Sequence, residues 1–406
     1  MELWRKNLFI LWGTQFLAML GMNLVVPFLP FFIRQLGVTD DASLAQWSGV
    51  AFSGTFFSAF IATPIWGAFG DRYGRKPMVI RALVGLGLSQ LLIGLSQSPL
   101  QVVLFRIVQG AISGFIASSL ALVSTNTPKD RIGYALGMLQ SATAGGMVMG
   151  PFVGGLLADL IGYREIFFIT ASLCFVGSTV VFYHVKELSH PSRGARPYTV
   201  RQNYVLMFSD RRLRLVGLTL IVGQMSVLMI EPIFALFIEE FQTGSAYLST
   251  VTGGIFSIAG LFMVISAPWW GKRNDRLGYK RNLTIALAAT GIVYAGHIIV
   301  TDLVQLGALR AILGFVRGGV LPTLYSLVSL FAPADRRGGM MAIGSSLTLF
   351  GNMLGPIIGG YVAAHFGIQT SFLVNSGMLL LMSLLLWRFL EESSSSNPPS
   401  KTEKAL

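Results

Sequence analysis

The stretch "GDRYGRKP", residues 70–77, decides the fold of this chain because a weaker copy of it lies in the second half of the sequence. The copy is "RNDRLGYKR", residues 273–281, and it places Asp275 at a shift of 204 residues from Asp71. A charged motif that returns at a shift of about half the chain length indicates a duplicated sequence.

Other motifs return at nearly the same shift. The segment "GPFVGG" at 150–155 matches "GPIIGG" at 355–360, a shift of 205 residues, and Arg106 matches Arg310 at 204. A shift that persists along the chain indicates two homologous halves rather than one repeated loop.

The composition indicates that both halves are embedded in a lipid membrane. Hydrophobic residues make up 53% of the chain and the mean hydropathy is +0.65, which excludes a soluble core with a polar surface. Twelve apolar runs are each long enough to cross about 30 Å of hydrocarbon as a helix. Their approximate spans are 8–33, 44–68, 78–97, 101–124, 133–158, 164–186, 213–238, 246–268, 282–301, 304–330, 338–364 and 368–390.

The predicted fold is therefore an all-α integral membrane protein whose twelve transmembrane helices form two pseudo-symmetric six-helix bundles. Six spans in each half keep both copies in the same orientation, as in transporters that work by rocking one half against the other. We predict a bundle at 1–186, a cytoplasmic loop at 187–212, a bundle at 213–390 and a disordered cytoplasmic tail at 391–406.

Basic residues predict which side of the membrane each loop faces. Of the 30 Lys and Arg residues, 24 lie in the terminal segments and in alternate loops, whereas the opposite loops contain only Arg34 and Arg164. Basic loops face the cytoplasm, so both termini are expected there. The net charge of +12 is thus explained by topology and anionic lipid, and we expect no nucleic-acid partner.

Charged residues inside the spans are the first functional candidates, because burying a charge in lipid is costly. Arg106, Glu231 and Arg310 each lie eight residues from an outer loop, about 12 Å deep, and we expect them to face one another. Glu231 is the only acid well inside a span, which favours a proton-coupling role. A static ion pair between Glu231 and Arg310 is the alternative.

Further polar and methionine residues are candidates for a substrate cavity. A polarisable wall adapts to varied apolar ligands, although methionine at helical spacing is also typical of simple packing. The candidates are Asn23, Gln140, Gln224, Glu231, Arg317, Asn352, Met147 and Met225.

The glycines of span five predict close helix packing. Gly146, Gly150 and Gly154 share one helical face, and Pro151 removes a backbone donor between them. Packing alone would explain this spacing.

Four motifs together resemble the major facilitator superfamily and its twelve-helix drug/proton antiporter family. They are "PFLP" at 27–30, "GAFGDRYGRK" at 67–76, "LFRIVQGAISG" at 104–114 and "GMVMGPFVGG" at 146–155. The resemblance covers all twelve spans. The resemblance implies that Arg106 takes part in proton coupling. A purely structural role, through hydrogen bonds between helices, is the alternative. Many family members carry an acid in helix one, where this chain has Asn23.

The resemblance also implies two conformational motifs. A latch that stabilises the outward-open state would contain Gly67, Asp71, Arg72, Gly74, Arg75 and Lys76. Charge that only directs membrane insertion is the alternative for this set. An exporter motif that seals the interface between the halves would contain Gly146, Gly150, Pro151, Gly154 and Gly155.

The expected function is export of amphipathic small molecules in exchange for protons by alternating access, by a monomer in the inner membrane of a bacterium. We expect no cofactor beyond the proton gradient, and no metal site, since Cys174 is the single cysteine. The chain contains no HExxH or GxSxG motif, so we expect no enzyme. The alternatives are transport of an anionic or polar metabolite such as a siderophore, bound by Arg106, Arg310 and Arg317, and a non-transporting receptor.

Overall fold

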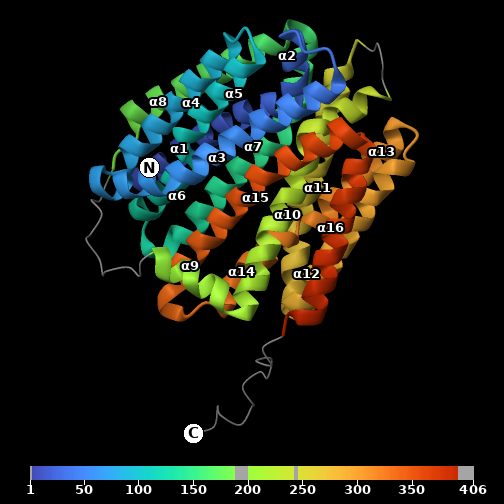
Figure 1. The fold of residues 1–406 in the computed structure, drawn as a ribbon. Coiled ribbons are helices and arrows are strands. Elements are labelled where there is room, and N and C mark those ends of the chain that lie inside the picture. The colour runs from blue at the N-terminus through green and yellow to red at the C-terminus, as the bar shows by residue number, and fades with distance from the viewer. Residues whose placement is uncertain (1, 188–199, 242–245, 392–406) are drawn as a thin grey trace.

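A computed structural model describes residues 2–187, 200–241 and 246–391, without the side chains of residues 68, 71 and 129. The described chain is helical (Figure 1). The α-helices are α1 (Leu3–Val25), α2 (Leu29–Gln35), α3 (Asp41–Tyr73), α4 (Arg75–Gly94), α5 (Pro99–Ala111), α6 (Phe115–Asn126), α7 (Ile132–Ile161), α8 (Tyr163–His184), α9 (Val200–Ser209), α10 (Arg211–Glu239), α11 (Leu248–Leu277), α12 (Tyr279–Gly296), α13 (Leu303–Arg317), α14 (Val320–Phe331), α15 (Arg337–Phe366) and α16 (Ile368–Phe389). Short 3₁₀ helices are η1 (Val26–Phe28), η2 (Lys129–Arg131), η3 (His297–Ile299) and η4 (Ala334–Arg336).

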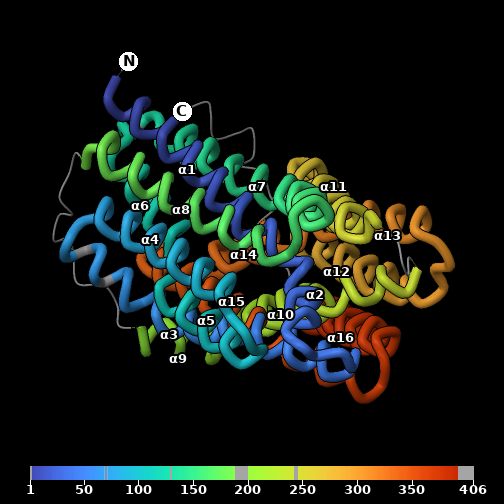
Figure 2. Tube along the Cα trace, turned by 90° about the horizontal axis from the view of Figure 1, so that it is seen from above, coloured from blue at the N-terminus to red at the C-terminus, as the bar shows by residue number. Residues whose placement is uncertain are grey.

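Twelve stretches of these helices are long and apolar enough to cross a membrane, and they confirm the twelve predicted spans. The helices form two lobes (Figure 2). Helices α1, α4, α6 and α8 lie in one lobe, and α11, α12, α13 and α16 lie in the other. Helices α7 and α11, and likewise α3 and α15, pack against each other across the boundary between the halves.

The stretch at 70–77 differs from the loop that we predicted. Helix α3 continues through Tyr73, and Gly74 alone connects it to α4. Gly74 has φ +100°, and its counterpart Gly278 has φ +84° between α11 and α12. Only glycine adopts this region at no steric cost, so both sharp turns depend on it. The charged motif is therefore two helix ends joined by one residue.

Spans four and ten are not the continuous helices that the sequence suggested. Each breaks near its middle, at 112–114 and at 318–319. A tryptophan fixes each break: Trp66 Nε1 donates to Ala111 O at 2.7 Å, and Trp270 Nε1 donates to Phe315 O at 2.7 Å. These bonds satisfy carbonyl groups that a helix end leaves without an intrahelical partner. The two tryptophans are 204 residues apart, so the duplication preserves the device.

The central segment also contains a helix that the sequence did not suggest. Helix α9 occupies residues 200–209 of the predicted loop at 187–212 and buries Asn203 and Met207. Residues 188–199 and the predicted disordered tail from 392 onward lie outside the described residues.

The glycine face of α7 packs on α1, as its spacing suggested. A Cβ at Gly150 would meet Asn23 Cβ at 2.5 Å, and one at Gly154 would meet the backbone of Leu24. The second half repeats this contact, because Gly355 meets the backbone of α10 in the same way. Small residues thus hold each bundle together where lipid provides little hydrophobic drive between helices.

Replacing Gly154 with alanine should destabilise the protein by about 1–3 kcal/mol, because the new methyl group overpacks the contact with α1. The matched control is Gly137→Ala on the same helix, where a methyl group would have no neighbouring atom within 4 Å and alanine favours the helix. Thermal unfolding in detergent measures both. Equal melting temperatures for the two variants would contradict the packing role of Gly154.

Candidate functional site

The two halves meet closely at one end of the molecule. We call the end that carries Arg34, Asp159 and Glu239 the outer end, and the end that carries Gly74 and Gly278 the inner end. At the outer end, a Cβ at Gly155 of α7 would meet the backbone of Ser249 of α11. One at Gly360 of α15 would meet the backbone of Ala45 of α3. Backbone contacts of this kind leave no room for a side chain, so the outer end is closed.

Asp159 adds a charged contact to this closure. Its carboxylate, on α7, accepts hydrogen bonds from the N–H groups of Ser249 at 3.2 Å and Thr250 at 2.7 Å, and from the Thr250 hydroxyl at 2.6 Å. These groups form the first turn of α11, whose free N–H groups and helix dipole favour an anion. One half therefore caps a helix of the other.

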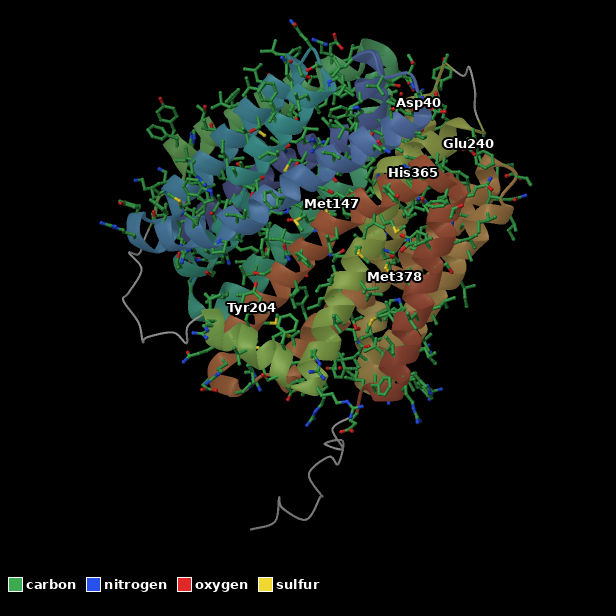
Figure 3. The ribbon with its side chains drawn as sticks, viewed as in Figure 1. Asp40, Met147, Tyr204, Glu240, His365 and Met378 are labelled. Carbon is green, nitrogen blue, oxygen red and sulfur yellow. The ribbon has the colours of Figure 1, made fainter. Side chains whose placement is uncertain are left out.

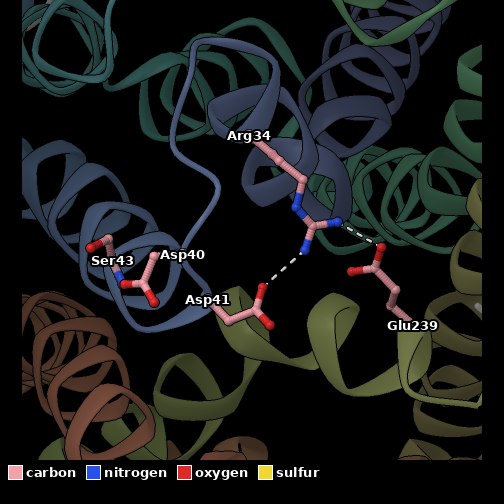
Figure 4. A network of polar contacts seen from close by, with 5 residues as sticks. All are labelled: Arg34, Asp40, Asp41, Ser43 and Glu239. Atoms are coloured by element: carbon pink, nitrogen blue, oxygen red, sulfur yellow. Dashed lines mark hydrogen bonds and ion pairs between the residues drawn. The ribbon is translucent and has the colours of Figure 1, made fainter.

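Arg34 forms a second polar contact between the halves (Figure 4). Its Nη1 donates to Glu239 Oε1 of α10 at 2.6 Å, and its Nη2 donates to Asp41 Oδ1 of α3 at 3.1 Å. The Glu239 bond joins the halves, whereas the Asp41 bond stays within the first. Partial burial and the nearby charge of Asp41 raise the pKa of the Glu240 carboxyl, which belongs to the same acidic cluster.

Asp40 and Glu240 lie together near this end, and Tyr204 lies at the opposite one (Figure 3). Asp40 Oδ2 accepts the N–H of Ser43 at 2.8 Å and caps α3. Hydrogen bonds from Ser43 lower the pKa of the Asp40 carboxyl. Asp40 therefore stays ionised and positions the start of α3 beside the Arg34 contact.

At the inner end, the glycines of the interface helices do not bring the backbones of the two halves into contact. The interface helices α3, α7, α11 and α15 each carry a glycine there at which an added Cβ would have no neighbour within 4 Å: Gly67, Gly133, Gly271 and Gly338. The buried apolar clusters follow the same pattern. The cluster around Phe32 includes Leu236 of α10, whereas the cluster around Leu83 contains residues of the first half alone. The halves are joined mainly at the outer end.

A cavity of about 380 Å³ lies within the second half and reaches α7 of the first. Gln140 of α7 lines it from the first half, and Gln224 of α10 and Arg317 of α13 line it from the second, among mostly apolar residues such as Met263. This combination of an apolar wall and few polar groups is typical of small-molecule sites. Arg317 ends α13 at the break in span ten, where the helix dipole favours a cation.

The other predicted cavity residues do not line this cavity. Asn23 donates to Met19 O at 2.7 Å and contacts Gly150. Asn352 is half-buried, and its Oδ1 has no hydrogen-bond partner among the described residues. Met225 presents its backbone to α15, and Met147 is 44% exposed near the middle of the molecule (Figure 3).

Glu231 is half-buried on α10 and forms no ion pair within 4 Å in the described part of the chain. The basic side chains that act on it electrostatically are Arg317 and then Arg310. Both belong to the second half. We expected Glu231 to face Arg106 of the first half, and Arg106 is not one of the residues that act on it. The carboxylate is attracted by two cations without being held by either.

The two pseudo-equivalent arginines have different surroundings. Arg310 is buried with its guanidinium 3.1 Å from the ring centroid of Phe234, and its Nε and Nη2 have no partner among the described residues. Arg106 lies 5.3 Å from the Phe52 ring centroid, and its Nη1 donates to Gln109 at 3.4 Å. The duplication therefore preserves the arginine and one aromatic neighbour, because Phe256, the counterpart of Phe52, has its ring centroid 5.8 Å from the Arg310 guanidinium. The close Phe234 contact and the Gln109 bond each occur in one half.

The predicted latch residues contact their own half. The N–H groups of Arg75 and Lys76 donate to the Glu187 carboxylate at 2.6 and 3.2 Å, and Arg72 lies over Tyr73. The side chain of Asp71 lies outside the described residues. The latch therefore stays a prediction.

The exporter motif has two contact faces. Gly146, Gly150 and Gly154 face α1 in the same half, whereas Gly155 faces α11 in the other. Pro151 also contacts the second half, because its carbonyl blocks any side chain at Gly253.

The sequence reasoning missed Asp159, Arg34 and Glu239 as functional candidates. The sequence contains one indication of their role. Basic residues are scarce in the outer loops, and Arg34 is one of only two there. The partners could not be read from the sequence, because Asp159 and Ser249 are separated by 90 positions and belong to different halves.

Comparisons with known proteins agree with this geometry. The Major Facilitator Superfamily family model matches residues 11–305 and 216–406. The multidrug resistance protein MdtG of Proteus mirabilis (strain HI4320) is 33% identical over 95% of this chain and 96% of its own length. A bacterial homologue of the human lysosomal transporter Spinster, in an inward-facing and occupied conformation, shares the fold with a TM-score of 0.81 at 14% identity, over 97% of this chain and 100% of its own. The nucleoside transporter NupG has a TM-score of 0.77 at 14% identity, over 95% and 100%.

Replacing Asp159 with alanine should speed amide hydrogen exchange in the first turn of α11 about fivefold or more, because losing a helix cap costs about 1 kcal/mol. Asp302→Ala is the matched control, since Asp302 caps α13 within its own half. It should affect α13 and leave α11 unchanged. Unaltered exchange at α11 in the Asp159 variant would show that the cap does not hold the closure.

Proposed function

The chain belongs to the major facilitator superfamily, and from that premise we propose that it exports amphipathic small molecules in exchange for protons by alternating access. The observation that carries the proposal is the mostly apolar cavity of the second half, which reaches Gln140 of α7 in the first half and lies at the level of the break in span ten. The relative named as a multidrug resistance protein supports the same substrate class.

The proposed setting follows from the charge distribution. Basic residues cluster at the inner end, which we assign to the cytoplasm of a bacterial inner membrane, with both termini on that side. The structure then corresponds to an inward-facing state closed toward the outside. We propose that the protein acts as a monomeric transporter rather than an enzyme, and that the proton gradient supplies the energy without a cofactor.

Alternating access requires the contacts at the outer end to break together. In the proposed cycle, the Asp159 cap and the Arg34–Glu239 bond open as the halves rock, while the glycine contacts of α7 with α1 remain. The outer-end contacts therefore set the population of the inward-facing state.

Glu231 is the proposed proton carrier. Its carboxylate is near the cavity residue Arg317 but forms no ion pair within 4 Å among the described residues. A group in this position is free to exchange a proton when rocking changes its distance from Arg317. In this proposal Arg310, together with Arg317, stabilises the ionised form of Glu231, and Arg106 takes part in proton coupling from the first half.

Transport of an anionic metabolite is the second candidate. Arg317 is the charged residue that lines the cavity, and Glu231 does not line it. A single cation in an apolar wall suits an anion as well as the aromatic face of a drug.

Glu231→Gln should abolish the dependence of efflux on the pH gradient, because glutamine cannot carry a proton. The measurement is efflux of a cationic dye from proteoliposomes with an imposed gradient. Glu240→Gln, at the residue that follows the outer end of the same helix, is the matched control and should retain coupling.

Undiminished coupled flux in the Glu231 variant would remove the proton assignment. Two results together would replace drug export by the metabolite function. Transport would be unaffected by the dye, and an anion would bind tightly in the wild type but not in the Arg317→Gln variant.

Glu239→Gln should shift the protein toward the outward-open state by about two- to fivefold in population ratio, since a half-exposed ion pair contributes about 0.5–1 kcal/mol. Distances between spin labels on the outer ends of the two halves measure the shift. Asp41→Asn is the control, because it removes only the bond within the first half. Equal effects of both variants would contradict the role of the bond between halves.

A further inference from the structure

A second large hollow lies on the outside of the first bundle, away from the central cavity. It is a groove of about 630 Å³ along α4, closed by Ile112 at the break in span four and by Phe182 of α8. Seven of the nine lining residues are apolar. The full lining is Lys76, Pro77, Ile80, Arg81, Val84, Gly85, Leu88, Ile112 and Phe182.

The two cations of the groove lie toward one end. Lys76 and Arg81 stand in the first two turns of α4, and Val84 and Leu88 continue the same face further along the helix. From Lys76 to Leu88 the helix rises about 18 Å, close to the roughly 15 Å thickness of one hydrocarbon leaflet. The groove thus runs from the inner membrane surface to the middle of the bilayer.

Within the part of the chain that the structure describes, neither cation forms an ion pair. Arg81 lies 3.5 Å from the Trp66 ring centroid and donates to Ser113 O at 3.0 Å, while its Nε and Nη1 are buried without a partner among the described residues. Lys76 Nζ donates to Phe182 O at 2.7 Å and retains donors for another acceptor. Glu187, the nearby acid, is engaged by the N–H groups at the start of α4.

We propose that this groove binds an anionic phospholipid of the cytoplasmic leaflet. The phosphate would lie at the mouth beside Lys76 and Arg81, and an acyl chain would follow Val84 and Leu88. A cationic end and an apolar length of one leaflet match both parts of that molecule. A free phosphate would leave the apolar length unused, and a zwitterionic lipid would offset the attraction at the mouth. The lipid would bind the first bundle alone and is distinct from the transported substrate.

The second half provides a matched control surface. Lys280 is the counterpart of Lys76 and lies 5.6 Å from the Trp387 ring centroid, just as Lys76 lies 5.6 Å from that of Phe182. The counterparts of Pro77 and Arg81 are Arg281 and Ile285, so this surface keeps two cations at the start of its helix but lacks the one a turn further along.

Native mass spectrometry of the purified full chain tests the proposal with phosphatidylglycerol and with phosphatidylcholine of the same acyl chains. The wild type should bind phosphatidylglycerol more tightly. Lys76→Gln and Arg81→Gln should each weaken that binding roughly fivefold and remove the preference when combined, whereas Lys280→Gln should not. Arg81→Lys should retain the preference, which separates loss of charge from loss of folding.

A second variant tests the apolar part of the groove. Leu88→Trp keeps both cations but fills the groove, and it should weaken binding of both lipids. Equal affinity of the wild type for the two lipids would overturn the proposal, as would unchanged binding in the Lys76→Gln, Arg81→Gln double variant. Competition by excess inorganic phosphate without any effect of Leu88→Trp would identify a site for a free anion instead.

Discussion

The close approach of helix backbones at glycine is the constraint on which the rest of the structure depends. In lipid, helices gain little from hiding apolar side chains, so contact between backbones must hold them together. Gly154 brings α7 against α1 within one half, and Gly155, the next residue, brings it against α11 of the other. One helix therefore belongs to a bundle and to the interface between bundles at the same time.

The two kinds of contact differ in what else supports them. The contacts of α7 with α1 continue over Gly146, Gly150 and Gly154 and involve three turns of apolar helix. The contacts between the halves are concentrated at the outer end and are reinforced by the Asp159 cap and the Arg34–Glu239 bond. Polar bonds of this type exchange with water when the interface opens. The bundles can then move as rigid bodies while the interface alternates.

The duplication preserves the framework and only part of the chemistry. Both halves retain the one-residue turn, the tryptophan that fixes the broken span and the glycine face that packs on the first helix. The acid Glu231 and its neighbour Arg317 have no charged counterpart in the first half, although Arg310 does, and Arg81 of the α4 groove has no charged counterpart in the second. The proposed proton site and the proposed lipid site therefore each depend on residues that only one half carries.

The sequence by itself determined the twelve spans, the two halves and the residues that pack on one face of span five. These features follow from local hydropathy and from an internal repeat, and both can be recognised without knowing which residues are in contact. It did not reveal that Gly74 alone connects α3 to α4, since apolar length does not show where a helix ends within a charged segment. Only the tertiary structure decided that Asp159 caps α11, that Arg34 binds Glu239 and that Gln140 lines the same cavity as Gln224 and Arg317. Those partners lie in different halves, and their distances depend on how two bundles pack, which no local pattern contains.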